Sequence, residues 1–212
     1  MPAEILKVNS TTPEPTLINY AAERIRSGHV VGMPTDTFYG LAADPLNLRA
    51  VDRVYDIKTR SRHKPLSLLI ENVGQAEDLV NDLSDDFYAL TEKFWPGPLT
   101  IIVKASSRLP LKVTANTGNV AIRVPDSAIA LALVRAARTP ITATSANLSG
   151  ASECTTAEDV RFQLGDRIPL IVDGGTTPRT VASTIVDLSD HGKWRVIREG
   201  AISIDKITEI LD

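Results

Sequence analysis

Residues 58–64, KTRSRHK, concentrate positive charge with no acidic residue among them. Lys58 and Arg60 lie two positions apart, a spacing that places both side chains on one side of an extended chain. An arginine can hold a phosphate through two parallel hydrogen bonds, and a lysine attracts it as a point charge. A charge run is more often a solvated surface, but this one lies between the predicted end of a helix near Lys58 and a buried strand. Its position therefore favours a clamp for a triphosphate.

Three further polar stretches follow apolar runs, where ligands collect in open α/β sheets. Residues 34–41, PTDTFYGL, contain two hydroxyls, a carboxylate and a phenol. In residues 142–150, TATSANLSG, Ser145 and Asn147 share the two-residue spacing of the cationic stretch, so both side chains are expected to face one cavity. The third set consists of DGG at 173–175, AST at 182–184 and Arg198. Turns and helix caps are the alternative interpretation of these stretches, because they use the same residue types.

Motifs of several other chemistries are missing from the sequence. It contains no Walker-type glycine loop, no dinucleotide-binding fingerprint and no Gly-x-Ser-x-Gly nucleophile elbow. Cys154 is the single cysteine, and the three histidines lack the spacing of metal ligands. We therefore expect neither a covalent enzyme intermediate nor a metal site built from protein side chains.

Length and composition predict one globular domain over residues 16–212, preceded by a leader over residues 1–15. The net charge of -3 and the pI of about 5.7 give no strong field that would draw the whole molecule onto nucleic acid or an anionic membrane. No apolar run has the length of a signal peptide or a membrane span. We expect a cytoplasmic protein.

Apolar side chains recur with two periods along the chain. Helical spacing predicts helices at 17–25, 48–57, 87–94, 129–134, 160–164 and from about 203. Short apolar runs predict strands at 30–33, 66–70, 99–104, 120–124, 141–144, 170–172, 184–187 and 194–197. Alternating helices and buried strands indicate an α/β fold whose largely parallel or mixed sheet is covered on both faces.

Six stretches of the sequence closely resemble the YrdC-like threonylcarbamoyl-AMP synthase family, and they occur in the family's order from about Thr16 onward. They are residues 34–41, Lys58-x-Arg60 with Lys64-Pro65-Leu66, residues 95–100 (WPGPLT), 120–125 (VAIRVP), 144–150 (TSANLSG), and 183–187 (STIVD) with Arg198. Two features depart from the family. The strand at 65–70 lacks the histidine that many relatives carry, and we expect no counterpart of the second C-terminal domain that some relatives carry.

The resemblance implies a single-domain, twisted open mixed sheet flanked by helices around a large basic cavity. The implied reaction joins L-threonine, bicarbonate and ATP to give threonylcarbamoyl-AMP and pyrophosphate. The product would pass to the tRNA threonylcarbamoyl-transfer machinery, which modifies the adenosine next to the anticodon. Magnesium is expected on the phosphates of ATP. Catalysis would rest on positioning and on stabilisation of charge by cations, without a covalent nucleophile.

The same resemblance assigns site residues. The cations that would stabilise charge during catalysis are Lys58 and Arg60. Residues expected around ATP are Lys58, Arg60, Arg62, Asn119, Ala143, Ser145, Asn147 and Arg198, with Asn119 and Ala143 contributing mainly backbone groups. Residues expected around threonine are Thr35, Ser67, Arg123 and Ser183.

Alternatives remain at this point. Arg123 could instead form a structural ion pair with Asp126. The cationic stretch could belong to an RNA-binding paralogue without synthase activity, although the acidic pI and the aromatic content of 5% disfavour a phosphate-binding or base-stacking face. A carbamoyl-adenylating domain of hydrogenase maturation is disfavoured by the single cysteine, because those domains belong to longer chains with cysteine-rich zinc modules.

Overall fold

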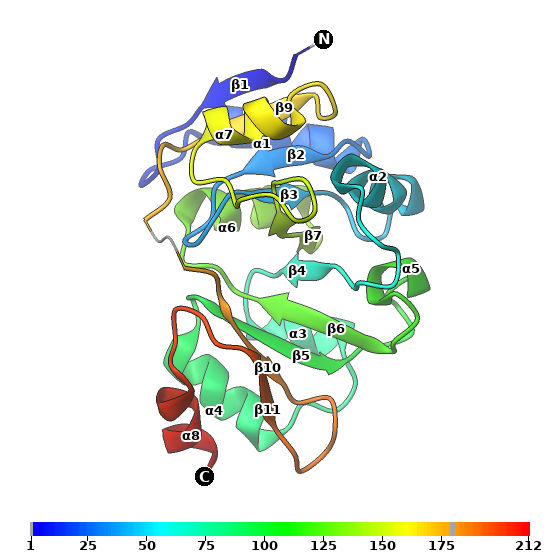
Figure 1. The fold of residues 1–212 in the computed structure, drawn as a ribbon, viewed down its shortest axis with the longest axis vertical. Helices are drawn as coiled ribbons and strands as arrows, with labels where there is room; N and C mark the ends of the chain where they lie inside the picture. The colour runs from blue at the N-terminus through cyan, green and yellow to red at the C-terminus, as the bar shows by residue number, and fades with distance from the viewer. Residues whose placement is uncertain (1, 179–180) are drawn as a thin grey trace.

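The computed structural model describes residues 2–178 and 181–212, and the strands of this part form two sheets (Figure 1). The five-stranded sheet has the order β1 (Glu4–Lys7), β9 (Leu170–Asp173), β2 (Val31–Met33), β3 (Gly40–Ala42), β8 (Thr144–Ser145). The six-stranded sheet has the order β11 (Arg195–Arg198), β10 (Thr184–Asp187), β5 (Leu99–Lys104), β6 (Asn119–Arg123), β4 (Ser67–Leu69), β7 (Ile141–Thr142). Both sheets combine parallel and antiparallel pairs. The predicted α/β class with mixed pairing is confirmed, and its strands divide between two sheets.

Most of the helices form two groups, one beside each sheet (Figure 1). Beside the five-stranded sheet lie α1 (Pro15–Arg26), α6 (Ala128–Ala137) and α7 (Ala157–Leu164). Beside the six-stranded sheet lie α3 (Val73–Leu79), α4 (Asp85–Phe94) and α8 (Ile204–Leu211). The remaining two, α2 (Leu48–Lys58) and α5 (Leu111–Thr114), pack against each other at one side of the molecule. No helix within the described residues is both long and apolar enough to cross a membrane.

α1 illustrates how the sequence specifies these helices. It begins at Pro15, whose fixed φ and missing N–H suit the first turn. Its apolar side chains recur at helical spacing and are buried: Ile18, Ala21, Ala22 and Ile25. The small alanines allow close packing on α6, whose Leu133 and Val134 join the same core. The helix ends before Gly28, as predicted, and the chain then enters β2.

The predicted strand at 141–144 is divided between the two sheets. β7 pairs with β4 in the six-stranded sheet, whereas β8 pairs with β3 in the five-stranded sheet. Ala143 lies between them, and its backbone N–H donates to the carbonyl oxygen of Ser67. Thr142 also joins the sheets, because its hydroxyl donates to the carbonyl oxygen of Leu41 at 2.8 Å. Ala143 therefore marks the point where the chain crosses from one sheet to the other.

The structure also contains elements that the periodicity did not predict. Residues 1–15, expected as a leader, contain β1, which pairs in parallel with β9 and so belongs to the five-stranded sheet. β3, α3 and α5 were not predicted either. They are three, seven and four residues long, too short to display a clear apolar period.

Candidate active site

A cavity of about 220 Å³ lies between the two sheets, beside the crossing at Ala143. The five-stranded sheet contributes β3, β8 and the loop that precedes β3, and the six-stranded sheet contributes side chains from β4, β5, β6, β10 and β11. The predicted site residues that line it are Thr35, Arg60, Ser67, Arg123, Ala143, Ser145, Ser183 and Arg198. The fold therefore brings together residues that come from separate motifs of the sequence.

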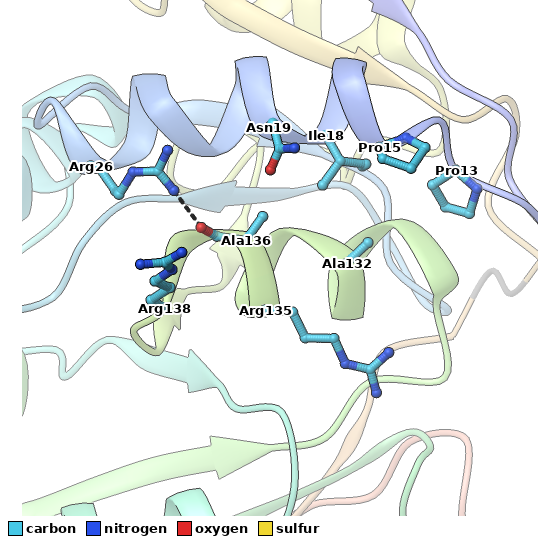
Figure 2. A pocket seen from close by; sticks show the side chains of 9 residues that line it. All are labelled: Pro13, Pro15, Ile18, Asn19, Arg26, Ala132, Arg135, Ala136 and Arg138. Atoms are coloured by element: carbon cyan, nitrogen blue, oxygen red, sulfur yellow. Dashed lines mark hydrogen bonds between the residues drawn. The ribbon is translucent and has the colours of Figure 1, made fainter.

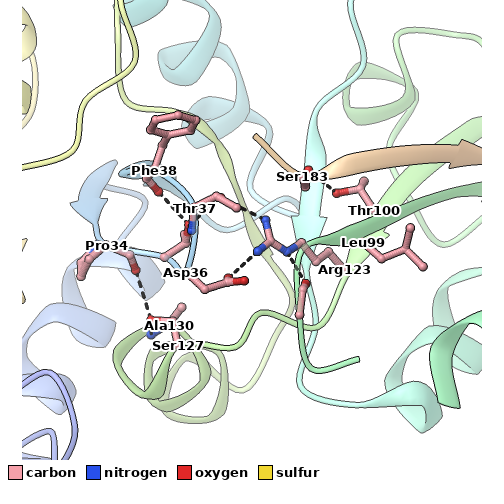
Figure 3. Close-up of polar contacts among 12 residues, drawn as sticks. Pro34, Asp36, Thr37, Phe38, Leu99, Thr100, Arg123, Ser127, Ala130 and Ser183 are labelled. Carbon is pink, nitrogen blue, oxygen red and sulfur yellow. Dashed lines mark hydrogen bonds and ion pairs between the residues drawn. The ribbon is translucent and has the colours of Figure 1, made fainter. Parts of the chain in front are cut away.

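Arg123 is the most deeply buried of the three arginines in this cavity. It ends β6, and its guanidinium forms an ion pair with Asp36; the two side chains are 7% and 2% exposed. Nη1 donates to Thr37 Oγ1 at 3.2 Å, and Nε donates to the carbonyl oxygen of Gly97 at 2.8 Å (Figure 3). The carboxylate partner is Asp36, not the Asp126 considered from the sequence. Removing one partner of a buried ion pair of this kind is strongly destabilising.

Thr35 belongs to a turn that its own hydroxyl stabilises. Its Oγ1 donates to the carbonyl oxygen of Phe38 at 2.7 Å and accepts the N–H of Thr37 at 3.1 Å. Such contacts are typical of Ser/Thr turns. Thr35 and Thr37 are both buried, and both line the cavity. The two interpretations of the 34–41 stretch are thus compatible, because a hydroxyl-stabilised turn forms part of the cavity wall.

Ser183 and Arg198 are in direct contact on the opposite wall. Nε and Nη2 of Arg198 donate to the carbonyl oxygen of Ser183 at 3.1 and 2.9 Å, and Nη2 also donates to its hydroxyl at 3.2 Å. The hydroxyl of Ser183 lies 2.9 Å from that of Thr100, which is buried (Figure 3). Ser183 was predicted for threonine and Arg198 for ATP, so the two predicted subsites adjoin here.

Lys58 is buried behind the cavity wall, whereas Arg60 lines the cavity itself. Lys58 is the last residue of α2, and Thr59 follows with a φ of 51°, so the chain turns instead of running straight. The Lys58 ammonium donates to the backbone oxygen of Asn147 at 2.7 Å, to its Oδ1 at 3.0 Å, and to the carbonyl oxygen of Ser145. The prediction that Lys58 and Arg60 face one cavity from an extended segment is therefore wrong.

Burial governs the charge of Lys58. It lowers the pKa of the ammonium to about 8, and the positive charge of Arg60 acts in the same direction. Glu153 acts oppositely, because its negative charge favours the protonated form of the ammonium. The ammonium is held by backbone and amide oxygens, which bear only partial charges.

Asn147 connects Lys58 to Ser145 and does not line the cavity. Its Oδ1 accepts from the Lys58 ammonium and, at 2.7 Å, from the Ser145 hydroxyl. Its Nδ2 donates to the carbonyl oxygen of Ala151 at 2.6 Å. Of the pair predicted to face one cavity, Ser145 does so and Asn147 lies behind it. Asn147 thus fixes the shape of the 145–151 segment.

Two other predicted nucleotide residues lie outside the cavity. Arg62 forms ion pairs with Asp52 and Asp56 at the surface of α2, and its guanidinium lies over the ring of Tyr55. Asn119 begins β6, four residues before Arg123 and so about 13 Å away along the strand at 3.3 Å per residue. Neither side chain is brought to the predicted clamp by the fold.

Polar residues that were not predicted as site residues also line the cavity: Thr37, Tyr39, Thr100, Thr144 and Glu153. Thr37 and Tyr39 belong to a stretch already selected for its polar side chains. The hydroxyl of Tyr39 donates to the carbonyl oxygen of Gly175 at 2.7 Å, and burial raises its pKa. Thr100 ends the 95–100 stretch that carries part of the family resemblance, but it was given no role at the site. Glu153 lies in a loop with no recognisable motif, and its position in the fold brings it to the cavity.

The described residues contain no group of three or more histidine, cysteine, aspartate and glutamate side chains that could hold a metal ion. Cys154 is buried, and its thiol donates to the carbonyl oxygen of Ala146 at 3.0 Å. Burial raises the pKa of this thiol to about 11, which keeps it protonated and weakly nucleophilic at neutral pH.

A second hollow, of about 670 Å³, lies between α1 and α6 (Figure 2). It is lined by Pro13, Pro15, Ile18, Asn19, Arg26, Ala132, Arg135, Ala136 and Arg138, and so contains none of the predicted site residues. Arg26 pairs with Glu23 at 2.6 Å and donates to the carbonyl oxygen of Ala136 near the end of α6. Arg135 pairs with Glu71 at 3.0 Å. We call this hollow the α1–α6 groove.

Residues 23–200 match the Sua5/YciO/YrdC family, which is described as telomere recombination. The chain is 40% identical over 195 residues to the threonylcarbamoyl-AMP synthase of Bacillus subtilis and 36% identical over 196 residues to that of Pyrococcus abyssi. Each alignment covers 92% of this chain, but only 56% and 57% of the respective relative. The chain therefore spans little more than half the length of these two proteins.

The fold matches a solved structure of P. abyssi Sua5 complexed with L-threonine. The TM-score is 0.94 at 35% sequence identity, and the match covers 99% of this chain and 61% of the other. The sequence match covers most of the chain, and the structural match extends over nearly all of it. The chain belongs to the Sua5/YciO/YrdC family.

Proposed function

We propose that the chain is an L-threonylcarbamoyladenylate synthase, which forms threonylcarbamoyl-AMP and pyrophosphate from L-threonine, bicarbonate and ATP. The observation that carries this proposal is the convergence of Arg60, Arg123 and Arg198 with several hydroxyl groups on one cavity between two sheets. The names of the B. subtilis and P. abyssi relatives and the threonine complex of P. abyssi Sua5 support the same activity.

Threonine is assigned to the wall that contains Arg123. The fixed positive charge there attracts the amino-acid carboxylate, and hydroxyls of Thr35, Ser67 and Ser183 lie in the same cavity. Arg123 is already held by Asp36 and Gly97, so it does not need to be ordered when the ligand arrives. Such preorganisation lowers the entropy cost of binding.

The triphosphate is assigned to Arg60, Ser145 and Arg198, with backbone groups at Ala143. Lys58 and Asn147 act from behind as positioning residues, because their hydrogen bonds hold Ser145 in place. The cavity is smaller than the roughly 300–1,000 Å³ common for small-molecule sites, so the adenosine is expected to extend beyond its opening. Arg62 and Asn119 are not assigned a contact.

The proposed reaction needs little acid–base chemistry from the protein. The threonine amine combines with bicarbonate to form a carbamate with loss of water, and a carbamate oxygen then attacks the α-phosphorus of ATP. The bond between that phosphorus and the bridging oxygen breaks, and pyrophosphate leaves with the electron pair. The arginines stabilise the charge that develops on the phosphate oxygens, and the cavity aligns the two reactants. Magnesium carried by the phosphates would neutralise part of the same charge.

The product is proposed to supply the machinery that transfers the threonylcarbamoyl group to the adenosine next to the tRNA anticodon. A cytoplasmic location, expected from the sequence, remains a prediction. Neither statement is needed for the assignment of the cavity.

The direct test incubates the purified chain with ATP, bicarbonate and labelled threonine, and follows pyrophosphate together with the labelled adenylate. We expect both products, and neither when threonine or bicarbonate is omitted. Pyrophosphate release that persists without threonine and bicarbonate would contradict the proposal.

A further inference from the structure

Glu153 places a carboxylate among the cations of the cavity. It lines the cavity together with Arg60 and Arg198, and it is half-buried. Within residues 2–178 and 181–212, no hydrogen bond or ion pair engages its side chain. An unpartnered carboxylate in a site assigned to a polyanion calls for a physical explanation, because it would repel the phosphates across a short distance.

The loop that carries Glu153 is fixed on both sides of it. Ala151 accepts a hydrogen bond from Asn147 at 2.6 Å, and the carbonyl oxygen of Cys154 accepts the N–H of Tyr39 at 2.9 Å. The Cys154 thiol is in turn bonded to Ala146. Glu153 is thus held beside the 145–147 segment. Its negative charge is close enough to Lys58 to offset part of the effect of burial, which lowers the pKa of that ammonium. It lies on the wall that we assign to the triphosphate.

A divalent cation resolves the conflict between this carboxylate and the phosphates. Magnesium in nucleotide sites is commonly held by one or two carboxylates together with phosphate oxygens and water, without a cage made only of protein. This arrangement fits the absence of a three-residue acidic cluster in the described part of the chain. We propose that Glu153 is a ligand, directly or through water, of the magnesium ion that accompanies the bound triphosphate. The inference rests on the proposed nucleotide site.

The ammonium group of threonine is the competing partner for Glu153. The geometry favours the metal, because the loop around Glu153 is bonded through Ala151 and Cys154 to the 145–147 segment, whose Ser145 we assign to the triphosphate. The test therefore measures threonine binding as well as nucleotide binding.

The experiment compares the wild type with Glu153→Gln, which keeps the shape of the side chain and removes its charge. ATP binding is measured by calorimetry, without turnover, over a series of MgCl₂ concentrations and in EDTA. We expect Mg²⁺ to strengthen ATP binding by the wild type. In Glu153→Gln this gain in affinity should fall at least about tenfold, because loss of even a second-sphere partner typically lowers metal affinity by about 10- to 100-fold. In EDTA the variant should bind ATP as well as the wild type or better, because a repulsive charge is gone.

Mn²⁺ gives a second readout. Its electron paramagnetic resonance signal in the ternary complex with ATP should change between wild type and Glu153→Gln. The matched control is Glu158→Gln, an exposed carboxylate on α7 outside the cavity, which should behave as the wild type in both measurements.

The outcomes separate this inference from the proposed function. If Mg²⁺ increased ATP affinity equally in the wild type and in Glu153→Gln, the metal assignment would be overturned and the nucleotide site would remain. Loss of threonine affinity with an unchanged Mg²⁺ gain would also overturn it, and would assign the carboxylate to the ammonium group. Failure of the wild type to bind ATP at all would overturn both proposals.

Discussion

Two hollows of the molecule are each lined by three arginines, and their surroundings differ. The cavity between the sheets contains Arg60, Arg123 and Arg198. The larger α1–α6 groove contains Arg26, Arg135 and Arg138 (Figure 2). Among the described residues, hydroxyl groups from separate motifs line the cavity, and none lines the α1–α6 groove.

The partners of these arginines explain the difference. In the groove, Arg26 and Arg135 pair with carboxylates at the surface, where water screens the charges. In the cavity, Arg123 is almost completely buried, and Arg60 donates to the carbonyl oxygen of Pro65 at 2.9 Å. A carbonyl oxygen bears only a partial charge, so the charge of Arg60 remains available to a ligand. Burial and convergence distinguish the site, whereas the number of arginines and the volume do not.

The largest expected effect is on stability, at the buried ion pair. Asp36→Asn should lower the free energy of unfolding by about 3–5 kcal/mol, because it removes the buried carboxylate that forms the ion pair with Arg123. Glu71→Gln, which breaks the surface pair with Arg135, should cost no more than about 1 kcal/mol. Urea unfolding of both variants measures the difference. Similar losses in the two would remove the distinction between cavity and groove.

Lys58 provides a test of burial through pH. Its pKa is about 8 in the folded protein, below the ordinary value of 10.5, so between these values the unfolded chain binds more protons. The free energy of unfolding should therefore rise as the pH increases from about 8 to 10.5. This gain is lost again as the pH falls through 8. A pKa difference of about 2.5 corresponds to about 3 kcal/mol.

The measurement is urea unfolding across this pH range in the wild type and in Lys58→Met, which fills a similar volume without a charge. The rise should be present in the wild type and reduced in the variant, and Lys206→Met, in the exposed part of α8, should keep it. Parallel pH profiles of the wild type and Lys58→Met would show that the Lys58 charge is not desolvated.

The cationic stretch contains its own internal comparison. Arg60→Ala should weaken ATP binding by about 1.5–3 kcal/mol, the usual value of a charge-assisted hydrogen bond. Arg62→Ala removes only exposed ion pairs with Asp52 and Asp56, so ATP affinity should change little and stability by about 1 kcal/mol or less. Calorimetric titration with ATP compares the two variants. An equal loss of affinity in both would mean that the nucleotide reaches past the cavity to the surface of α2.

Sequence reasoning anticipated the convergence of the polar stretches better than the direction of individual side chains. Most of the selected stretches contribute residues to one cavity, because apolar periods locate strand ends. Lys58 was misplaced because the two-residue rule assumes an extended chain, and Thr59 adopts a left-handed conformation instead. Asn147 lies behind Ser145 because its side chain is bonded to Lys58 and Ala151. The division of residues 141–144 between two sheets depends on pairing partners distant in the sequence. Asp36 could not be chosen over Asp126 for the same reason.

The smallest expected effect concerns the hydroxyl of Thr100, to which the apolar periodicity of the sequence gave no role. Thr100 contacts the Ser183 hydroxyl at 2.9 Å in the wall assigned to threonine. Thr100→Val keeps the size and removes one hydrogen bond, so threonine binding should weaken by about 0.5–1.5 kcal/mol through a less well-oriented Ser183. ATP affinity should be nearly unchanged, since Arg198 retains its bonds to the Ser183 carbonyl oxygen. Thr208→Val, at a half-buried position of α8 outside the cavity, should leave both affinities unchanged.

Competition by serine and valine sharpens the same prediction. Serine lacks one methyl group, a loss worth about 1–3 kcal/mol in a pocket, so it should bind more weakly than threonine without being excluded. Valine should bind still more weakly, because it leaves polar groups of the cavity without a partner. In Thr100→Val the preference for threonine over valine should narrow, as one of those polar groups has been removed. An unchanged preference together with unchanged threonine affinity would place the threonine side chain away from Ser183, and Arg123 would then be the group that locates the amino acid in the cavity.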